Sequence, residues 1–437
     1  MSMAQILNIR QKIIWFLDTL KGSPVKDKLN YTSANLDAAN SDVRHDDNEK
    51  NLKSLLNHAI ATTAYYKAYT AVNSLEDFPV VNKNLIRDNL KDFTSNTFEL
   101  TTCVKASTSG STGVPFSIYQ NKEKVNKNTA DDIFFSSKSN YRIGSHLVYI
   151  KIWPDKFNFK QECSLKLRNI HPHDVFKLTN DTIDELITKL NKSKEAINFK
   201  GYVSAFEKIC RHLDALPENP ITFKTQSIIT ISESINLYTK NAVKKYFGVW
   251  PVSRYSNLEN GVIAQQFQGD DPRFWINDSS YIIEIFDLNE NRKLNYGQHG
   301  RIVLTDLYNL ATPLIRYDTG DVGTMHLDTK NKPYFSELYG RKLDLIYDTK
   351  GNLVPPHITD KLCKYGDFKQ YQLVQKGLKD YDINLNTTIK VDENSMIKEF
   401  KTYFGQDAHI KVNYVDGIPL LGSGKRREMV NEYYKTD

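Results

Sequence analysis

A short run of hydroxyl and glycine residues is the first part of this sequence whose composition suggests chemistry. The run ASTSGSTGVPF, residues 106–116, holds five serine or threonine residues and two glycines. Glycines let backbone N–H groups approach phosphate oxygens closely, and hydroxyl side chains add neutral donors. The run is not a Walker loop, because Val114 follows Gly113 where that motif needs a lysine. Taken alone, it fits a phosphate-binding loop and a flexible Ser/Gly linker equally well.

A lysine near the C-terminal end is the second candidate. Lys425 lies in PLLGSGKRR, residues 419–427, directly after a Gly-Ser-Gly tripeptide. A compact ammonium group on a long stem, carried at the tip of a glycine loop, suits the neutralisation of phosphate oxygens. The same residue also fits a solvated basic cluster with Arg426 and Arg427, and the residues alone favour that second interpretation.

Composition limits the kinds of partner. The chain has 437 residues, 40% hydrophobic and 25% charged, and 58 Lys+Arg against 52 Asp+Glu give a net charge of +6. No long basic block indicates a nucleic-acid or membrane surface. The four cysteines lie far apart without a CxxC pair. This favours reduced thiols and a cytoplasmic protein over a disulfide framework or a zinc site.

The N-terminal region is expected to be helical and then irregular. AQILNIRQKIIWFLDTLKG has apolar residues at helical spacing, but charges interrupt it, so we expect an amphipathic helix docked on the body. It is too charged to span a bilayer, and association with a membrane surface is the lesser alternative. Residues 22–50 are polar and turn-rich and predict a surface loop. Helical periodicity resumes at residues 51–69.

Short β-rich segments alternate with helical ones in the middle of the chain. Strands are predicted within residues 146–153, 227–232, 281–286 and 301–307, and a helix over 204–216. This alternation predicts an α/β fold with partly parallel sheets. Beyond Asp344 the composition becomes lysine-rich. This part contains the predicted strands KQYQLVQK, YDINLN and IKVNYV and the predicted helix MIKEFKTYF. We therefore expect a large N-terminal domain with mixed sheets and a small, mobile C-terminal α+β domain.

Five segments, taken in order, resemble the motifs of the adenylate-forming superfamily. They are STSGSTGVP (107–115), RYSNLENG (254–261), TPLIRYDTGD (312–321), GRKLDLI (340–346) and PLLGSGKRR (419–427). Within that superfamily, LLNHAIATTAYYKAY (55–69), DFPVVNKNLIRDNL (77–90) and KGYVSAF (200–206) resemble the phenylacetate-CoA ligase branch and its CapK-type members. ISESI (231–235) is similar to the Gly-Glu-Pro segment of that branch.

The resemblance implies a domain organisation and a reaction. It implies an adenylation domain over residues 1–343 with a helical segment 1–70, a hinge at 344–348 and a lid domain at 349–437. The reaction implied is activation of a carboxylic acid with ATP and Mg²⁺, with CoA as a candidate second cofactor. The acyl group would then pass to an amine, sugar or thiol acceptor, in surface-polysaccharide (capsule or lipopolysaccharide) assembly. No nucleic-acid partner and no membrane span are expected, and the oligomeric state stays open.

The resemblance also implies roles for individual residues. Lys425 would be the catalytic cation, Glu259 the Mg²⁺ ligand and Asp344 the hinge residue. Tyr255 would lie against adenine, Asp321 would bind the ribose hydroxyls, and Arg341 would reach the ribose or phosphate. The full set implied to bind ATP or AMP is Thr108, Ser109, Gly110, Ser111, Thr112, Gly113, Ser232, Glu233, Tyr255, Ser256, Asp321 and Arg341. YIKIWPDKF (149–157) with Trp153 fits both an acyl pocket and core packing.

The sequence departs from the family's pattern at several of these positions. Ser256 and Leu258 replace a glycine and a threonine, ISESI lacks the proline, and the phosphate loop lacks a lysine after its last glycine. Leu258 removes a hydroxyl that relatives aim at the α-phosphate, so Thr108, Ser111 or Thr112 would have to compensate. Two alternatives to an acyl-transferring ligase with an amine or sugar acceptor therefore stay open. One is an acyl-CoA ligase, and the other is a catalytically degenerate nucleotide-binding partner protein.

Overall fold

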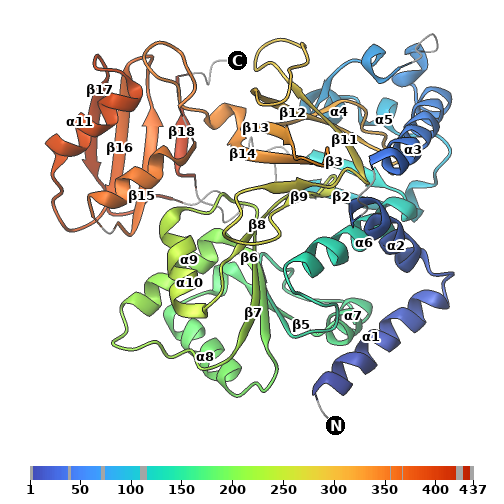
Figure 1. Ribbon diagram of the computed structural model, residues 1–437, viewed down its shortest axis with the longest axis horizontal. Coiled ribbons are helices and arrows are strands. Elements are labelled where there is room, and N and C mark those ends of the chain that lie inside the picture. Colours follow the sequence, from blue (N-terminus) through green and yellow to red (C-terminus); the bar gives the residue numbers. More distant parts are fainter. Residues whose placement is uncertain are drawn as a thin grey trace.

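The computed structural model describes residues 3–37, 41–69, 74–108, 116–354, 356–366, 368–419 and 427–433. The side chains of residues 3–6, 8, 41–46, 108, 343, 356, 357 and 363 are also outside this description. The described chain forms one large mixed sheet, a four-stranded sheet and a two-stranded ribbon, with helices on their faces (Figure 1).

The large sheet has twelve strands, and the strand segments predicted within residues 146–153, 227–232, 281–286 and 301–307 lie in it. Its strands are β1 (Val81–Asn82), β4 (Leu147–Lys151), β5 (Ile170–Asp174), β6 (Ile197–Tyr202), β7 (Thr225–Ile231), β8 (Val252–Asn257), β9 (Gly261–Gln265), β10 (Phe274–Ile276), β11 (Tyr281–Phe286), β12 (His299–Asp306), β13 (Tyr317–Leu327) and β14 (Pro333–Arg341). They follow the order β11-β12-β13-β14-β10-β9-β8-β7-β6-β4-β5, and β1 pairs with β13 beside this path.

One half of the sheet is parallel. Strands β5, β4, β6, β7 and β8 run side by side in the same direction. The connecting helices are α7 (Phe159–Leu167), α8 (Asn180–Asn191), α9 (Val203–Asp214) and α10 (Leu237–Phe247). Helix α9 covers residues 204–214 of the helix predicted over 204–216, and its Phe206, Ile209 and Leu213 are buried together in the core that covers this half. The alternation of strands and helices confirms the predicted α/β class.

The other half is antiparallel and packs against helices from the N-terminal region. Helices α4 (Lys83–Asp88), α5 (Leu90–Phe93) and α6 (Lys122–Lys138) contribute to this region, and β2 (Val104–Thr108) pairs with β3 (Phe116–Gln120) as a separate ribbon. The short 3₁₀ helices are η1 (Tyr66–Tyr69), η2 (Leu75–Asp77), η3 (Leu100–Thr102), η4 (Val175–Lys177), η5 (Lys342–Asp344) and η6 (Pro356–Lys364).

Three helices precede this body. They are α1 (Met3–Thr19), α2 (Pro24–Asp37) and α3 (Ser41–Thr62). The first docks on the body as predicted: Gln11 Nε2 donates to the Ile143 carbonyl at 3.1 Å, and Arg10 lies 3.5 Å from Glu195. The surface loop predicted for residues 22–50 is wrong, because most of that stretch is helical in α2 and α3.

The error has a physical cause in the face that α2 buries. Its buried residues are the polar Thr32 and Asn35 rather than apolar ones, so no hydrophobic periodicity marks the helix. Thr32 Oγ1 lies 3.0 Å from both Asp131 Oδ1 and Lys127 Nζ of α6. Lys127 also pairs with Asp131 at 2.6 Å, and both side chains are fully buried. A satisfied buried polar network therefore holds α2 where the sequence pattern predicts a loop.

This network predicts a measurable stability effect at Thr32. Thr32→Val keeps the shape of the side chain but removes one partner from each of the buried Lys127 and Asp131 groups. We expect the free energy of unfolding to fall by about 1–2 kcal/mol in urea titrations. Thr388→Val, at an exposed position, is the matched control and should change it by less than about 0.5 kcal/mol. Equal stability of the two variants would contradict a stabilising role for the network.

The C-terminal module has its own sheet and core. Strands β15 (Gln370–Gln375), β16 (Asp380–Asn386), β17 (His409–Tyr414) and β18 (Met429–Asn431) form a sheet in the order β17-β16-β15-β18. Helix α11 (Glu393–Phe404) packs on it through Met396, Phe400 and Phe404. Figure 1 shows this module to one side of the large sheet. Among the described helices, none is both long and apolar enough to cross a membrane.

Candidate nucleotide site

Part of the predicted site lies outside the described residues. This holds for the side chain of Thr108, for Ser109, Gly110, Ser111, Thr112 and Gly113, and for Lys425. The residues that flank these segments are described, and they show where the segments enter and leave the body of the protein.

Tyr255 and Asp321 form the centre of the described site. Tyr255 lies in β8, and its hydroxyl donates to Asp321 Oδ2 at 2.7 Å. Asp321 lies in β13 directly after Gly320, whose φ of +80° places it in the left-handed region that favours glycine. The backbone N–H of Asp321 donates to Thr319 Oγ1 at 3.1 Å. The turn therefore directs the Asp321 carboxylate toward the Tyr255 phenol.

Burial governs the ionisation of this pair. Burial raises the pKa of Asp321, and although the Tyr255 hydrogen bond and the charges of Lys83 and Arg341 lower it, burial prevails. Burial and the adjacent Asp321 raise the pKa of Tyr255 well above its usual value. Tyr255 thus stays protonated as a donor, and the carboxylate is held in a place where its charge is costly. Such a carboxylate is available to accept hydrogen bonds from ligand hydroxyls.

The raised pKa of Asp321 predicts opposite effects of Asp321→Asn on stability and on ATP binding. A carboxyl whose pKa is higher in the folded state destabilises that state as pH rises above the unfolded pKa. Asp321→Asn should therefore raise the nucleotide-free Tm at pH 7, and this gain should shrink as pH falls toward 4. ATP affinity should fall by about tenfold, because an amide is a weaker acceptor for ribose hydroxyls. Scanning fluorimetry and calorimetric titration measure both, and a loss of Tm at pH 7 would contradict this account.

Glu259 follows β8 and is almost fully buried, with 1% of its surface exposed. Its Oε1 accepts from the Tyr317 hydroxyl at 2.9 Å and lies 2.9 Å from Lys83 Nζ. Its Oε2 is buried and has no hydrogen-bond partner among the described residues. Burial and Glu259 together raise the pKa of Tyr317 well above its usual value, so that Tyr317 remains a donor.

The unpartnered Oε2 fits the Mg²⁺ site that the sequence implies. Mg²⁺ is a hard cation that binds one or two protein carboxylates together with substrate phosphates. No group of three or more metal-binding side chains occurs in the part of the chain that the structure describes. One free carboxylate oxygen is the kind of ligand that such a shared protein–phosphate site requires.

Lys83 is a residue of this site that the sequence interpretation missed. It begins α4 directly after β1, which pairs in parallel with β13 at Tyr317 and Asp318. Its ammonium reaches Glu259 and lies 5.7 Å from the centroid of the Phe116 ring. The segment DFPVVNKNLIRDNL carried a branch resemblance, but only the β1–β13 pairing brings this lysine beside Glu259.

The described ends of the hydroxyl-rich run are close to the same carboxylate. Phe116, the first described residue after the run, stacks on Tyr317 with ring centroids 6.2 Å apart. Four residues further along β3, Gln120 Nε2 donates to the Glu259 carbonyl at 2.8 Å. The C-terminal end of the predicted phosphate loop therefore adjoins Glu259 and Lys83.

The remaining predicted nucleotide residues lie on neighbouring strands. Ser232 follows β7 with a φ of +71°, and Glu233 Oε2 accepts from the backbone N–H of Ser204 at 2.8 Å. Ser256 follows Tyr255 in β8, and the side chain of Leu258 is exposed at 62%. The structure thus brings Tyr255, Asp321 and Glu259 into one connected cluster, while Ser232 and Glu233 lie at the end of β7.

Arg341 and Asp344 lie where the two sheets approach each other. Arg341 ends β14 and pairs in register with Asp321, and Asp344 lies in η5. Asp344 forms an ion pair with Arg427, the first described residue after the segment that contains Lys425. Burial and the charge of Arg341 lower the pKa of Arg427. The C-terminal flank of the Lys425 segment is therefore anchored at the predicted hinge, close to Arg341.

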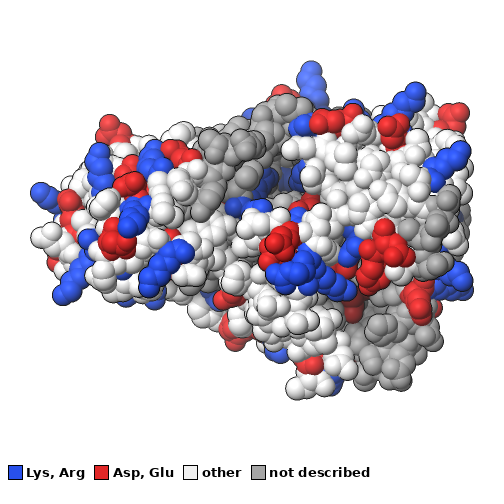
Figure 2. Space-filling model, turned by 90° about the horizontal axis from the view of Figure 1, so that it is seen from above, with Lys and Arg blue, Asp and Glu red and all other residues white. Residues whose placement is uncertain are grey.

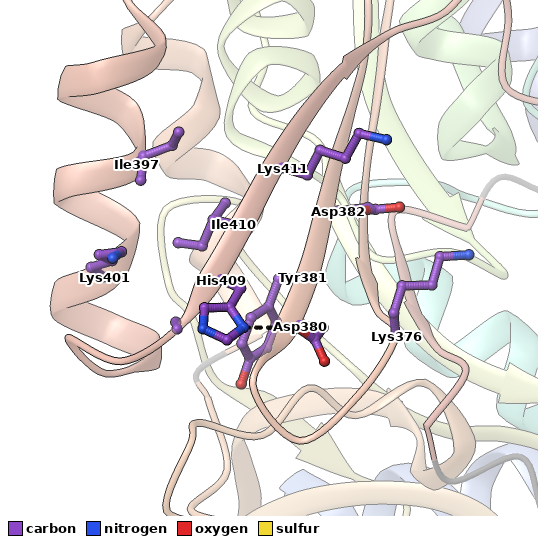
Figure 3. A pocket seen from close by; sticks show the side chains of 10 residues that line it. Lys376, Asp380, Tyr381, Asp382, Ile397, Lys401, His409, Ile410 and Lys411 are labelled. Atoms are coloured by element: carbon purple, nitrogen blue, oxygen red, sulfur yellow. Dashed lines mark hydrogen bonds and ion pairs between the residues drawn. The ribbon is translucent and has the colours of Figure 1, made fainter.

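Two surface hollows lie apart from this cluster. One, of about 460 Å³, is on the C-terminal module between α11, β16 and β17, where His409 Nδ1 contacts Asp380 at 3.0 Å (Figure 3). The other, of about 450 Å³, is lined by residues after β4, by residues in and directly after β5, and by α8. None of the residues implied to bind the nucleotide or Mg²⁺ or to act as the hinge lines either hollow, but Trp153 of the segment YIKIWPDKF lines the second. Figure 2 shows acidic and basic side chains interspersed over the face viewed.

Comparison with known protein sequences identifies two relatives and one family model. The model for the CapK C-terminal domain matches residues 346–432. Protein CapK of Staphylococcus aureus is 23% identical over 386 residues, which is 82% of this chain and 81% of CapK. A phenylacetate-coenzyme A ligase of Aromatoleum evansii is 26% identical over 181 residues, 37% of this chain and 40% of that ligase.

Comparison with solved structures identifies the fold. A 2-hydroxyisobutyryl-CoA ligase in its postadenylation state, bound to 2-HIB-AMP, matches with a TM-score of 0.68 at 15% identity, over 90% of each chain. ATP-bound MatB from Rhodopseudomonas palustris matches with a TM-score of 0.53 at 15% identity, over 74% of this chain and 65% of that one. These similarities confirm the predicted fold class and the predicted resemblance to the adenylate-forming superfamily and its CapK-like branch.

Proposed function

We propose that this chain, a relative of the CapK-like branch of the adenylate-forming superfamily, activates a carboxylic acid with ATP and then transfers the acyl group. In the first step a carboxylate oxygen attacks the α-phosphorus, the bond to pyrophosphate breaks, and an acyl-adenylate forms. In the second step an amine or thiol attacks the acyl carbonyl, releases AMP and loses a proton to solvent.

One observation carries this proposal. Two segments lie outside the described residues, and the described residues next to them converge on one cluster of side chains suited to binding a nucleotide. Phe116 ends the hydroxyl-rich run beside Tyr317 and Glu259, and Arg427 follows the Lys425 segment beside Asp344 and Arg341. Between these two anchors lies the bonded pair Tyr255–Asp321. A nucleotide bound there would have hydrogen-bond acceptors for its ribose, a free carboxylate oxygen for a metal, and cations for its phosphates.

Each residue of the site has a proposed role that follows from its chemistry. Tyr255 would lie against the adenine ring, Asp321 would accept from the ribose hydroxyls, and Arg341 would reach the ribose or phosphate. Lys83 would neutralise phosphate oxygens from one side. Lys425 would bridge the acid and the α-phosphate. Preorganised cations and N–H donors lower the barrier because negative charge develops on the phosphorus oxygens in the transition state.

Glu259 would hold Mg²⁺, which when bound supplies charge neutralisation at the phosphates. The Lys83 ammonium, 2.9 Å from Oε1, partly neutralises this carboxylate. Residues 344–348 would act as the hinge between a large domain, 1–343, and a lid, 349–437. Rotation of the lid would bring Lys425 in for adenylation and withdraw it for acyl transfer.

The acceptor is proposed from relatives alone. The sequence resemblance to CapK-type members is the argument for an amine or sugar acceptor in surface-polysaccharide assembly, and the match to a phenylacetate-coenzyme A ligase favours CoA. A second candidate function is therefore an acyl-CoA ligase. Release of AMP that requires CoA and yields a thioester would select it over transfer to an amine.

Acid-dependent ATP–pyrophosphate exchange tests the proposed first step. The full chain is mixed with ATP, Mg²⁺ and labelled pyrophosphate, and amino acids, sugar acids, dicarboxylic acids and aryl acids are screened one at a time. Exchange that depends on one class of acid is expected. Absence of exchange with every acid, together with measurable ATP binding, would instead support a nucleotide-binding partner protein, for which Ser256 and Leu258 are the sequence argument.

A further inference from the structure

A row of side chains crosses the carboxyl end of the parallel strands. Ile150 of β4 pairs with Gly201 of β6, so the next residues, Lys151 and Tyr202, are neighbours. Tyr202 pairs with Ile231 of β7, and Ile231 pairs with Arg254 of β8. Side chains alternate between the two faces of a strand, so these four residues point to one face. Arg254 identifies that face, because it bonds to Asp132 and Ser136 of α6.

This face carries more positive than negative charge. Lys200 Nζ donates to Asp132 Oδ1 at 2.5 Å, and Arg254 donates to the same oxygen. Burial acts to raise the pKa of Asp132, but the charges of Lys200 and Arg254 outweigh it and hold the pKa well below its usual range. One carboxylate therefore already neutralises part of the charge of two buried cations.

Two further cations near this face, Lys151 and Arg168, form no salt bridge with a described residue, although Asp174 of β5 pairs in register with Lys151. Lys151 Nζ lies over the Trp153 ring at 4.2 Å and the Tyr149 ring at 5.0 Å from their centroids, and no described residue forms a salt bridge with it. Burial lowers the pKa of Lys151. Arg168, after α7, has a buried Nε without a hydrogen-bond partner among the described residues. The charge of Asp132 acts to raise the pKa of Lys151, but burial outweighs it. No described carboxylate lies within ion-pair distance of this partly desolvated ammonium, so a structural role alone does not account for Lys151.

The row adjoins the proposed nucleotide site. Arg254 directly precedes Tyr255 in β8, so their side chains point to opposite faces and the row meets the nucleotide cluster at the carboxyl ends of the strands. At the other end, Ser204 follows Tyr202 by two residues and donates its N–H to Glu233. Ligands of open parallel sheets bind beyond the carboxyl ends of the strands, which is where Lys151 and Tyr202 lie. A ligand resting on this face would therefore reach the nucleotide from the side of β4, β6 and β7.

We infer that the acid activated by this protein carries a second anionic group, and that it is a dicarboxylic acid whose non-reacting carboxylate pairs with Lys151. This inference rests on the proposed function, because it assigns the substrate class of the same site. Tyr149 and Trp153 would pack against the carbon chain. The ammonium would exchange its ring contacts for a charge-assisted hydrogen bond, which is the stronger interaction. A monocarboxylic acid of the same length would leave Lys151 unpaired.

A matched panel of acids tests the inference on the full chain. Succinate and glutarate are compared with butyrate and valerate, which have the same chain lengths but no second carboxylate. ATP–pyrophosphate exchange and calorimetric binding in the presence of AMP and Mg²⁺ are measured for each. We expect kcat/KM for exchange to be at least tenfold higher with the dicarboxylates. Equal or higher exchange with butyrate or valerate would overturn the inference and leave the proposed function standing.

The two remaining outcomes separate the two proposals. Dicarboxylate binding without exchange would keep Lys151 as part of a dicarboxylate-binding site but would overturn the proposed activation step. If succinate and glutarate neither bind nor support exchange, the inference is overturned, whatever other acids do.

Substitutions at Lys151 test whether this lysine causes the preference for dicarboxylic acids. Lys151→Met keeps the stem and removes the charge, and it should lower the dicarboxylate-to-monocarboxylate ratio of kcat/KM at least tenfold with ATP affinity unchanged. Lys151→Arg should retain the preference. Lys194→Met, at an exposed lysine of the same domain, is the control and should change nothing. If Lys151→Met does not fold, Lys151→Arg and the wild-type panel decide. An unchanged ratio in folded Lys151→Met would overturn the role of this lysine.

Discussion

Glu259→Gln should lower acid-dependent ATP–pyrophosphate exchange by about 10²-fold at a fixed millimolar Mg²⁺ concentration and shift its Mg²⁺ midpoint upward. The reason is local. Oε1 is already bound by Tyr317 and Lys83, so the buried and unpartnered Oε2 is the oxygen left for a metal. In the variant the amide oxygen can still accept from Tyr317 and Lys83, which places an NH₂ group where the metal ligand stood.

The Mg²⁺ titration separates this role from a structural one. If Glu259 only neutralises Lys83 and accepts from Tyr317, the variant should lose Tm while its Mg²⁺ midpoint stays the same. Glu162→Gln, an exposed residue of α7, is the matched control and should behave as wild type in both measurements. An unshifted midpoint in folded Glu259→Gln would remove this carboxylate from the metal site.

Three residues of the candidate site could be proposed from the sequence, but a fourth could not. Tyr255, Asp321 and Glu259 could be proposed because each lies within a short motif, and the order of these motifs along the chain resembles that of the superfamily. Lys83 could not, since its place beside Glu259 depends on β1 pairing with β13, a strand far away in the sequence. Contacts between distant segments leave no local pattern, so only the three-dimensional structure reveals them.

The same limit explains the wrong prediction for α2, and it explains why the row of side chains across β4, β6, β7 and β8 could not be predicted. Hydrophobic periodicity predicts helices that bury apolar faces, but α2 buries Thr32 and Asn35 against charged residues of α6. The charges of the row come from separate strands and become neighbours only through the register of β4, β6, β7 and β8. For YIKIWPDKF the sequence left acyl pocket and core packing equally open. Lys151 lies over the Trp153 and Tyr149 rings and forms no salt bridge with a described residue, which favours the pocket.

Lys425→Ala is the variant for which we expect the largest loss of activity. Lys425 is proposed to neutralise charge on the acid and the α-phosphate as the new bond forms, an interaction that strengthens only in the transition state. Removing one such group lowers rates by about 10²–10³-fold. ATP affinity should stay within about tenfold of wild type, a ground-state change of no more than about 1.4 kcal/mol. The loss should therefore appear in kcat for exchange and much less in the Kd for ATP.

The ion pair that follows the Lys425 segment makes the comparison of Lys425→Ala with a control variant informative. Arg427 pairs with Asp344 at the proposed hinge, so truncating Lys425 leaves that anchor in place. Lys390→Ala removes an exposed lysine from the same module and should leave both exchange and ATP binding unchanged. If Lys425→Ala retained exchange at the rate of Lys390→Ala, the lysine would have no part in adenylation. Because Lys83 already lies beside Glu259 in the described structure, it would then become the cation to test for the same role.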